Sequence, residues 1–205
     1  MTEASTVQDS TLIERVAQII SAIFHPLILP AIAFTILIAA DPANDLSRKL
    51  IIGTVALIFS VVLVPSYIFW LKSRGIVEST DIIIRQQRIN PLAIAITSYF
   101  VGFLLLKVLQ APALVQGLMF CYFTNTLLVL LITNWWKVSI HTTAVSGPLT
   151  ALIYQFGNVV LPFLVLIPLV GASRLILKRH TIAQVIVGAA IGVFLTALQL
   201  RLLFS

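Results

Sequence analysis

Two histidines and several basic side chains are the residues whose chemistry stands out in this sequence. His180 lies in a basic stretch, with Arg174 six residues before it and Gln184 four residues after it. His141 follows a short aromatic and basic segment earlier in the chain. Basic side chains can neutralise the oxygens of a phosphoryl group, one histidine can attack phosphorus, and another can protonate the leaving oxygen. These residue types predict a site that binds a phosphate anion.

Acidic residues are absent from the second half of the sequence. The 124 residues that follow Asp81 contain no aspartate or glutamate. Metal-dependent phosphatases and transferases hold divalent ions through carboxylates, and proton-coupled transporters usually carry an acid within the membrane. The sequence therefore predicts a site that uses neither a metal ion nor another cofactor, and it makes small-molecule transport a less favoured function.

The composition determines which elements must position these residues. Of the 205 residues, 60% are hydrophobic and only 10% are charged, which is too little charge to cover the surface of a soluble domain. We therefore expect an all-α fold, a polytopic helical bundle in a membrane. Residues 1–11 are predicted to be a tail, and residues 12–205 a single transmembrane domain. The net charge of +6 is attributed to membrane-facing loops and anion sites, so no nucleic-acid partner is expected.

The apolar segments predict seven transmembrane helices, or six if one segment is short or re-entrant. His25-Pro26 and Pro30 should kink the first helix, and His25 is more simply explained as a packed side chain than as a functional one. Gly188 and Gly192 are spaced for close contact between helices. The expected spans are residues 16–40, 50–71, 92–109, 113–133, 141–158, 159–177 and 181–203.

The order of the spans places the basic clusters on one side of the membrane. Arg85 and Arg88 follow the second segment, His141 follows the fourth, and His180 follows the sixth. An even number of crossings separates each pair of clusters. They should therefore reach the same membrane face, as one composite site requires.

The stretch from Ser173 to Gln184 resembles the third motif segment of the type 2 phosphatidic acid phosphatase superfamily. That segment reads Ser-Arg, five residues, His, three residues, Asp. Every marked position matches except the last, where Gln184 replaces the aspartate. Ser139-Ile140-His141 resembles the second segment, which normally reads Ser-Gly-His.

The first motif segment, a lysine followed seven residues later by Arg-Pro, is matched only by the stretch from Arg85 to Pro91. Asp81 stands where the lysine would fall, and the proline is displaced by two residues. The resemblance spans about residues 80–200. It is greatest to a divergent bacterial branch with Lys-x-Ser-x-His in the second segment and His-Thr-x-x-Gln in the third.

The resemblance implies a role for each matching residue. His180 would be the nucleophile that forms a phosphohistidine, and His141 would be the general acid for the leaving group. Arg88 and Arg174 would hold phosphate oxygens, and Ser139 would add a hydrogen-bond donor.

Two positions depart from the motif set. The absent lysine would be replaced by Arg85 or by Lys137, which lies four residues before His141. Gln184 shares a helix face with His180, so its carbonyl can accept the imidazole N–H and fix the tautomer. It cannot stabilise the imidazolium as a carboxylate does. We therefore expect either weakened catalysis or a site that binds a phosphate headgroup without cleaving it.

The predicted function is metal-free hydrolysis of a lipid phosphate monoester or diphosphate. The alternative is a non-catalytic subunit or lipid-binding scaffold of a membrane complex. The expected partners are membrane lipids, a phosphorylated lipid or phosphate, and either a larger complex or further copies of the chain. The resemblance favours the inner or plasma membrane of a bacterium, with the sidedness of the site left open.

Overall fold

The computed structural model describes residues 11–204, and every regular element in this range is helical. The predicted tail lies outside these residues, apart from Thr11, which caps the first helix. In chain order the elements are α1 (Leu12–Ile23), α2 (Leu29–Ala39), α3 (Leu46–Leu57), η1 (Ile58–Val62), α4 (Leu63–Ser73), η2 (Gln86–Arg88), α5 (Ile89–Val108), α6 (Ala113–Thr133), α7 (Ile140–Phe156), η3 (Gly157–Val165), α8 (Leu166–Ile176), α9 (Ile182–Ala190), η4 (Ile191–Leu195) and α10 (Thr196–Leu203).

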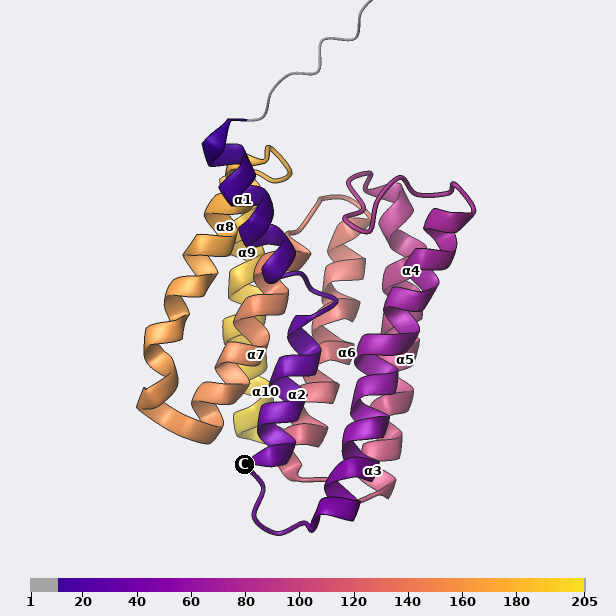
Figure 1. The fold of residues 1–205 in the computed structure, drawn as a ribbon, viewed down its shortest axis with the longest axis vertical. Helices are drawn as coiled ribbons and strands as arrows, with labels where there is room; N and C mark the ends of the chain where they lie inside the picture. Colours follow the sequence, from indigo (N-terminus) through magenta and orange to yellow (C-terminus); the bar gives the residue numbers. More distant parts are fainter. Residues whose placement is uncertain (1–10, 205) are drawn as a thin grey trace, which may run out of the picture.

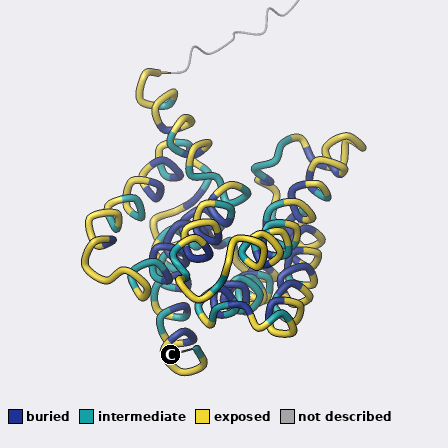
Figure 2. The backbone as a smooth tube through the Cα atoms, turned by 60° about the horizontal axis from the view of Figure 1, so that its bottom comes forward, coloured by how far each residue is buried: buried dark blue, intermediate teal, exposed yellow. Residues whose placement is uncertain are grey.

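The bundle has the dimensions and composition of a membrane domain, which confirms the predicted fold class. Among the described residues, five continuous helical stretches are long and apolar enough to cross a membrane. Large apolar side chains are exposed along the outside of the bundle, as lipid contact requires, and the buried residues face inward (Figure 2). The five stretches are Leu46–Ser73, Gln86–Val108, Ala113–Thr133, Ile140–Ile176 and Ile182–Leu203.

The first predicted span is broken rather than kinked. Helix α1 ends at Ile23 and α2 begins only at Leu29, because Pro26 removes a backbone donor and disfavours helical geometry at the residue before it. The ring of His25 lies in this break, where its Nδ1 accepts the N–H of Leu27 at 3.2 Å. Helix α1 packs on α8, whereas α2 packs on α3 and α7, so the break lets one segment cover two parts of the bundle.

The longest apolar stretch, Ile140–Ile176, doubles back on itself. Helix α7 ends at Gly157, whose φ of 63° lies in the left-handed region that favours glycine. After η3 the chain returns as α8, which packs against α7 (Figure 1). This stretch therefore supplies the two antiparallel segments that the sequence predicted over residues 141–177.

Helices α7 and α9 lie in direct backbone contact. A Cβ atom added at Gly188 would lie 2.5 Å from the carbonyl oxygen of Ser139, and one added at Gly192 would overlap Ser146 Oγ. Hydroxyls on α7 donate to α9 carbonyls across this contact, with Thr142 to Val185 O at 3.1 Å. The close contact predicted from the glycine spacing is therefore present, and its partner is α7.

The main apolar core lies in the other half of the bundle, between α2, α3, α5 and α6, and includes Phe34, Ile52, Leu106, Leu118 and Met119. The loops 74–85, 134–139 and 177–181 all lie at one end of the bundle (Figure 1). This placement agrees with the even number of crossings counted from the sequence.

Candidate functional site

Arg174 is at the centre of the cluster of polar residues at this end. It lies in the last turn of α8 and is only 1% exposed. Its Nη1 donates to Ser21 Oγ on α1 at 2.7 Å, and its Nη2 donates to Asp81 Oδ2 at 2.6 Å. The guanidinium therefore joins α8 to the N-terminal segment and to loop 74–85, and its Nε–H is left without a partner within residues 11–204.

Arg88 is the second buried arginine, 4% exposed, and it joins two loops of the same end. Its Nε donates to Ile82 O at 2.7 Å and its Nη1 donates to Val138 O at 3.2 Å. Buried charges are costly unless they are hydrogen-bonded, so these carbonyls account for its position. The bonds also hold loop 74–85 against loop 134–139, which carries Lys137.

His180 precedes α9 and is oriented by the capping box of that helix. Thr181 Oγ1 accepts the N–H of Gln184, and Gln184 Oε1 accepts the N–H of Thr181 at 3.2 Å. The same Oε1 lies 3.0 Å from His180 Nδ1. Because Oε1 is an acceptor, Nδ1 carries the proton and Nε2 carries the lone pair. The glutamine thus fixes the tautomer that the helical spacing predicted.

The ring of His180 is held in its neutral form. Burial lowers its pKa to about 3, and the positive charges of Arg88, Lys137 and Arg174 contribute to the shift. Its Nε2 is buried and, in the described part of the chain, accepts no hydrogen bond. A buried imidazole with a free lone pair beside several cations has the protonation state that a nucleophile needs.

Two further imidazoles of this cluster lie against each other. His141, in the first turn of α7, is 3% exposed, and its ring contacts His25 edge-on at 5.1 Å between centroids. The Nε2 atoms of both rings are buried without a partner among residues 11–204. Because Nδ1 of His25 accepts from Leu27, its Nε2 must be protonated and free to donate. The sequence left His25 out of the site, since only the tertiary fold brings it to His141.

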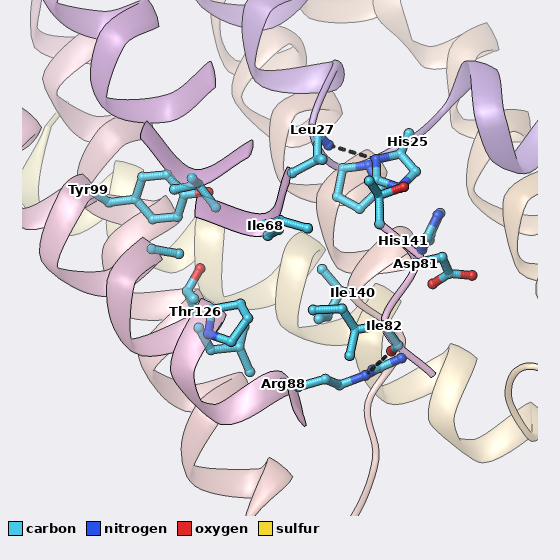
Figure 3. Close-up of a pocket in the computed structure, with 16 residues that line it drawn as sticks. His25, Leu27, Ile68, Asp81, Ile82, Arg88, Tyr99, Thr126, Ile140 and His141 are labelled. Atoms are coloured by element: carbon cyan, nitrogen blue, oxygen red, sulfur yellow. Dashed lines mark hydrogen bonds between the residues drawn. The ribbon is translucent and has the colours of Figure 1, made fainter. Parts of the chain in front are cut away.

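A cavity of about 110 Å³ opens between these groups. Its charged and imidazole lining is formed by His25, Asp81, Arg88 and His141, with the hydroxyls of Thr80, Tyr99 and Thr126, and the rest is apolar (Figure 3). Arg174, His180 and Lys137 are not part of the lining, but Arg174 is bonded to Asp81, which is. The cavity is therefore a small apolar pocket with polar groups converging at one end, which is the usual form of a ligand site.

Asp81 is an acidic residue whose partner in the fold the sequence did not predict. Burial alone would raise its pKa, but Arg174, with His141 and Arg88, lowers the pKa below its usual value. The carboxylate is therefore charged at neutral pH and bound to the arginine that the motif resemblance assigns to phosphate. In this contact Asp81 Oδ2 accepts a charge-assisted hydrogen bond from Arg174, as an anionic phosphate oxygen would.

The remaining predicted residues occupy the edge of the cluster. Lys137 Nζ donates to Arg179 O at 2.8 Å, and burial together with Arg88 lowers the pKa of Lys137 to about 8. Ser139 is the N-cap of α7, where its Oγ accepts the N–H of Thr142 at 3.4 Å. Arg85 Nη1 donates to the carbonyls of Thr133 and Asn134 at the end of α6.

These contacts divide the predicted residues by their availability to a ligand. Arg85 caps α6, and the hydroxyl of Ser139 caps α7, so both make structural bonds at the ends of helices. Arg88, Arg174, His141, His180 and Lys137 form one electrostatically coupled group, with Gln184 bonded to His180. Among the described residues no three His, Cys, Asp or Glu side chains are placed to hold a metal ion.

Comparison with known proteins found no match to this chain. No family model matches the chain, and neither the curated proteins nor the solved structures contain a match.

Proposed function

We propose that this membrane protein hydrolyses a lipid phosphate monoester or diphosphate through a phosphohistidine, as the resemblance to the type 2 phosphatidic acid phosphatases suggests. The observation that supports this most is that His180 and His141 interact electrostatically with each other and with the buried Arg174. The two residues lie 39 positions apart in the sequence, and each presents a buried Nε2 that makes no hydrogen bond within residues 11–204.

In the proposed reaction Nε2 of His180 attacks phosphorus, and the bond from phosphorus to the lipid oxygen breaks. The departing oxygen takes the proton from Nε2 of His141, which enters this step as an imidazolium, acts as the general acid and becomes neutral. Water then attacks the phosphohistidine, the N–P bond breaks, and neutral His141 accepts the proton of that water. Phosphate leaves and both histidines return to their starting state.

The cations supply the electrostatic part of catalysis. Arg174, Arg88 and Lys137 lie close enough to His180 to shift its pKa, so each can also stabilise negative charge on phosphoryl oxygens. Gln184 holds the ring of His180 through Nδ1, but as a neutral group it adds no charge to favour the developing imidazolium. The proposed enzyme is therefore slower than one with aspartate at position 184.

The membrane setting supports a lipid as the substrate. The cavity beside His141 is lined mainly by apolar residues at the end of the bundle, where lipid headgroups would lie. We assign the protein to the inner or plasma membrane of a bacterium on the same resemblance.

Phosphate release by the purified protein tests the proposal. In detergent or nanodiscs, the native protein should release inorganic phosphate from lipid phosphates, and His180→Ala should not. Rapid quenching with ³²P-labelled substrate should trap an acid-labile phosphoprotein that is absent from His180→Ala. Equal rates for both proteins would rule out the catalytic role.

The ion pair between Arg174 and Asp81 favours a second function, phosphate binding without cleavage. A carboxylate held at 2.6 Å must be displaced, or must tolerate a neighbouring phosphate, before Arg174 can take part in catalysis. A non-catalytic scaffold of a membrane complex would retain lipid phosphate in equilibrium dialysis and release none as inorganic phosphate. The same His180→Ala protein would bind it equally well.

A further inference from the structure

A second cavity, of about 60 Å³, lies deeper in the bundle than the histidines. Its walls come from α5, α6 and α7 and from the start of α10, and they include Tyr122, Asn125, Thr143 and Thr196. Tyr122 and Asn125 lie in the middle of α6, which is long and apolar enough to cross the membrane. Polar side chains at that depth are costly and usually mark a functional site.

Two atoms at this cavity lack the hydrogen bonds that burial demands. Asn125 is 6% exposed, and its Nδ2 donates to Thr196 Oγ1 at 2.9 Å. In this arrangement Oδ1 is the acceptor left over, and it has no partner anywhere in residues 11–204. The buried hydroxyl of Tyr122 is also unpartnered within the same range. An unpaired polar group in an apolar interior is strongly unfavourable, so both atoms are expected to meet a ligand.

The two cavities share one wall. Pro26, Leu92, Tyr99, Thr126 and Ile140 line both of them. A ligand whose phosphate lies beside His141 therefore extends directly toward Asn125. Asn125 lies beside Gly147, which follows His141 by six residues and is thus about 9 Å deeper along α7. The inner cavity would receive the part of the lipid next to the phosphate.

We propose that the inner cavity is a subsite for a hydrogen-bond donor in the lipid backbone, either a hydroxyl or an amide N–H. This inference rests on the proposed lipid phosphate site. Asn125 Oδ1 can accept only from a donor, and the Tyr122 hydroxyl can then donate to an oxygen of the same group. Diacyl phosphatidate offers only ester acceptors, and a polyprenyl phosphate offers neither donor nor acceptor along its chain. The preferred substrates are therefore lysophosphatidate-like or amide-linked lipid phosphates.

Binding to a protein that cannot turn over separates this subsite from catalysis. His180→Ala protein in nanodiscs is titrated with lysophosphatidate, with its analogue that has hydrogen in place of the hydroxyl, with ceramide 1-phosphate and with phosphatidate. We expect lysophosphatidate to bind about tenfold more tightly than the deoxy analogue, the effect of one buried hydrogen bond. The ceramide lipid should bind more tightly than phosphatidate if the donor is an amide N–H.

Two substitutions test whether the inner cavity causes the preference for lysophosphatidate over its deoxy analogue. Asn125→Leu in the same background should reduce the lysophosphatidate-to-deoxy ratio to about one while the affinity for the deoxy analogue stays unchanged. Tyr122→Phe, which removes only the unpartnered hydroxyl, should reduce the ratio without loss of the folded protein. Its elution volume and melting temperature check the fold.

The outcomes for the subsite and for the proposed function are distinct. Equal affinities for the donor-bearing and donor-free lipids, with Asn125 intact, would overturn the subsite and indicate that water alone fills the cavity. A clear preference combined with no phosphate release by the native protein would keep the subsite and overturn hydrolysis. Failure of every lipid to bind would overturn both.

Discussion

The guanidinium of Arg174 is paired with an acid 93 residues earlier in the chain, at 2.6 Å between Nη2 and Asp81 Oδ2. Arg174 also donates to Ser21 on α1. A carboxylate is thus already bound to the arginine to which the proposed function assigns a phosphate. Under that proposal an entering phosphoryl group must compete with Asp81, so substitution of Asp81 tests the proposal directly.

Asp81→Asn should increase the affinity for inorganic phosphate by about tenfold, because the substitution removes a like charge and an internal competitor from the site. Without phosphate the variant should be less stable, since a buried arginine loses its charged partner. Saturating phosphate should restore the melting temperature. The measurement is a thermal melt with and without phosphate. Glu78 is an exposed acid in the same loop, so the control Glu78→Gln should change neither the phosphate affinity nor the melting temperature.

The stability contributed by Asp81 should depend on pH with a defined sign. Its pKa is lowered in the folded protein, so the ion pair contributes fully above the unfolded value of about 3.9 and is lost as pH falls through the folded value. The difference in unfolding free energy between native protein and Asp81→Asn should therefore shrink below pH 4. A constant difference down to pH 2 would show that Asp81 acts through something other than its charge.

His180 should also make the folded protein less stable as pH falls, but over a higher pH range than Asp81. Its pKa falls from about 6.5 to about 3 on folding, so between those values the unfolded chain binds the extra proton and stability drops as pH falls. His180→Gln should lose less stability than the native protein between pH 6.5 and 4, as measured by denaturant unfolding. If the variant and the native protein lose stability equally, the ring is not held neutral.

Because of Lys137, the affinity for phosphate should decrease at alkaline pH. Burial and Arg88 lower its pKa to about 8, so its positive charge is lost as pH rises through that value. Phosphate affinity of the native protein should fall severalfold between pH 7 and 9. Lys137→Arg keeps the charge through this range and should flatten the profile, whereas an unchanged decrease would assign the titration to another group.

The role of Gln184 can be separated from its role in capping α9. Gln184→Leu should remove both the capping box and the bond to His180 Nδ1, whereas Thr181→Ala removes a cap and leaves that bond in place. Each should cost about 1 kcal/mol of stability, because each loses a helix cap. Only Gln184→Leu should reduce phosphate release strongly. Gln184→Asp should raise the rate, because a carboxylate stabilises the imidazolium.

The fold class was predictable because hydrocarbon-length apolar runs leave few alternatives to a helical bundle. Close packing of the last span was also predictable, because Gly188 and Gly192 are spaced by one helical turn, but the spacing did not indicate that the partner is α7. At His25-Pro26 the sequence predicted a kink, whereas the structure has a break between two helices. Sequence alone does not tell whether the helices on either side of a proline keep a common axis.

The part of the site that the sequence missed depends on long-range contacts. Nothing in the sequence near Asp81 indicates that it pairs with Arg174, and nothing near His25 indicates that its ring contacts His141. The His25–His141 contact arises because α1 packs on α8 while α2 packs on α7. Asp81 reaches Arg174 because Arg88 holds the end of loop 74–85 through Ile82 O. Conversely, Arg85 and Ser139 matched a motif by type, yet the structure uses them to cap helices. Local sequence cannot distinguish a capping donor from a ligand donor.

The contact between α7 and α9 has a consequence for the two histidines of the proposed reaction. The N–H of Ser139 donates to Gln184 O, and Thr143 Oγ1 donates to Gly188 O. These bonds tie the first turn of α7, which carries His141, to the helix that His180 precedes. Asp81 and His25 belong to connecting segments outside these two helices. In the proposed function the α7–α9 contact would therefore set the spacing of the two histidines, whereas rearrangement of the connecting segments would leave that spacing unchanged.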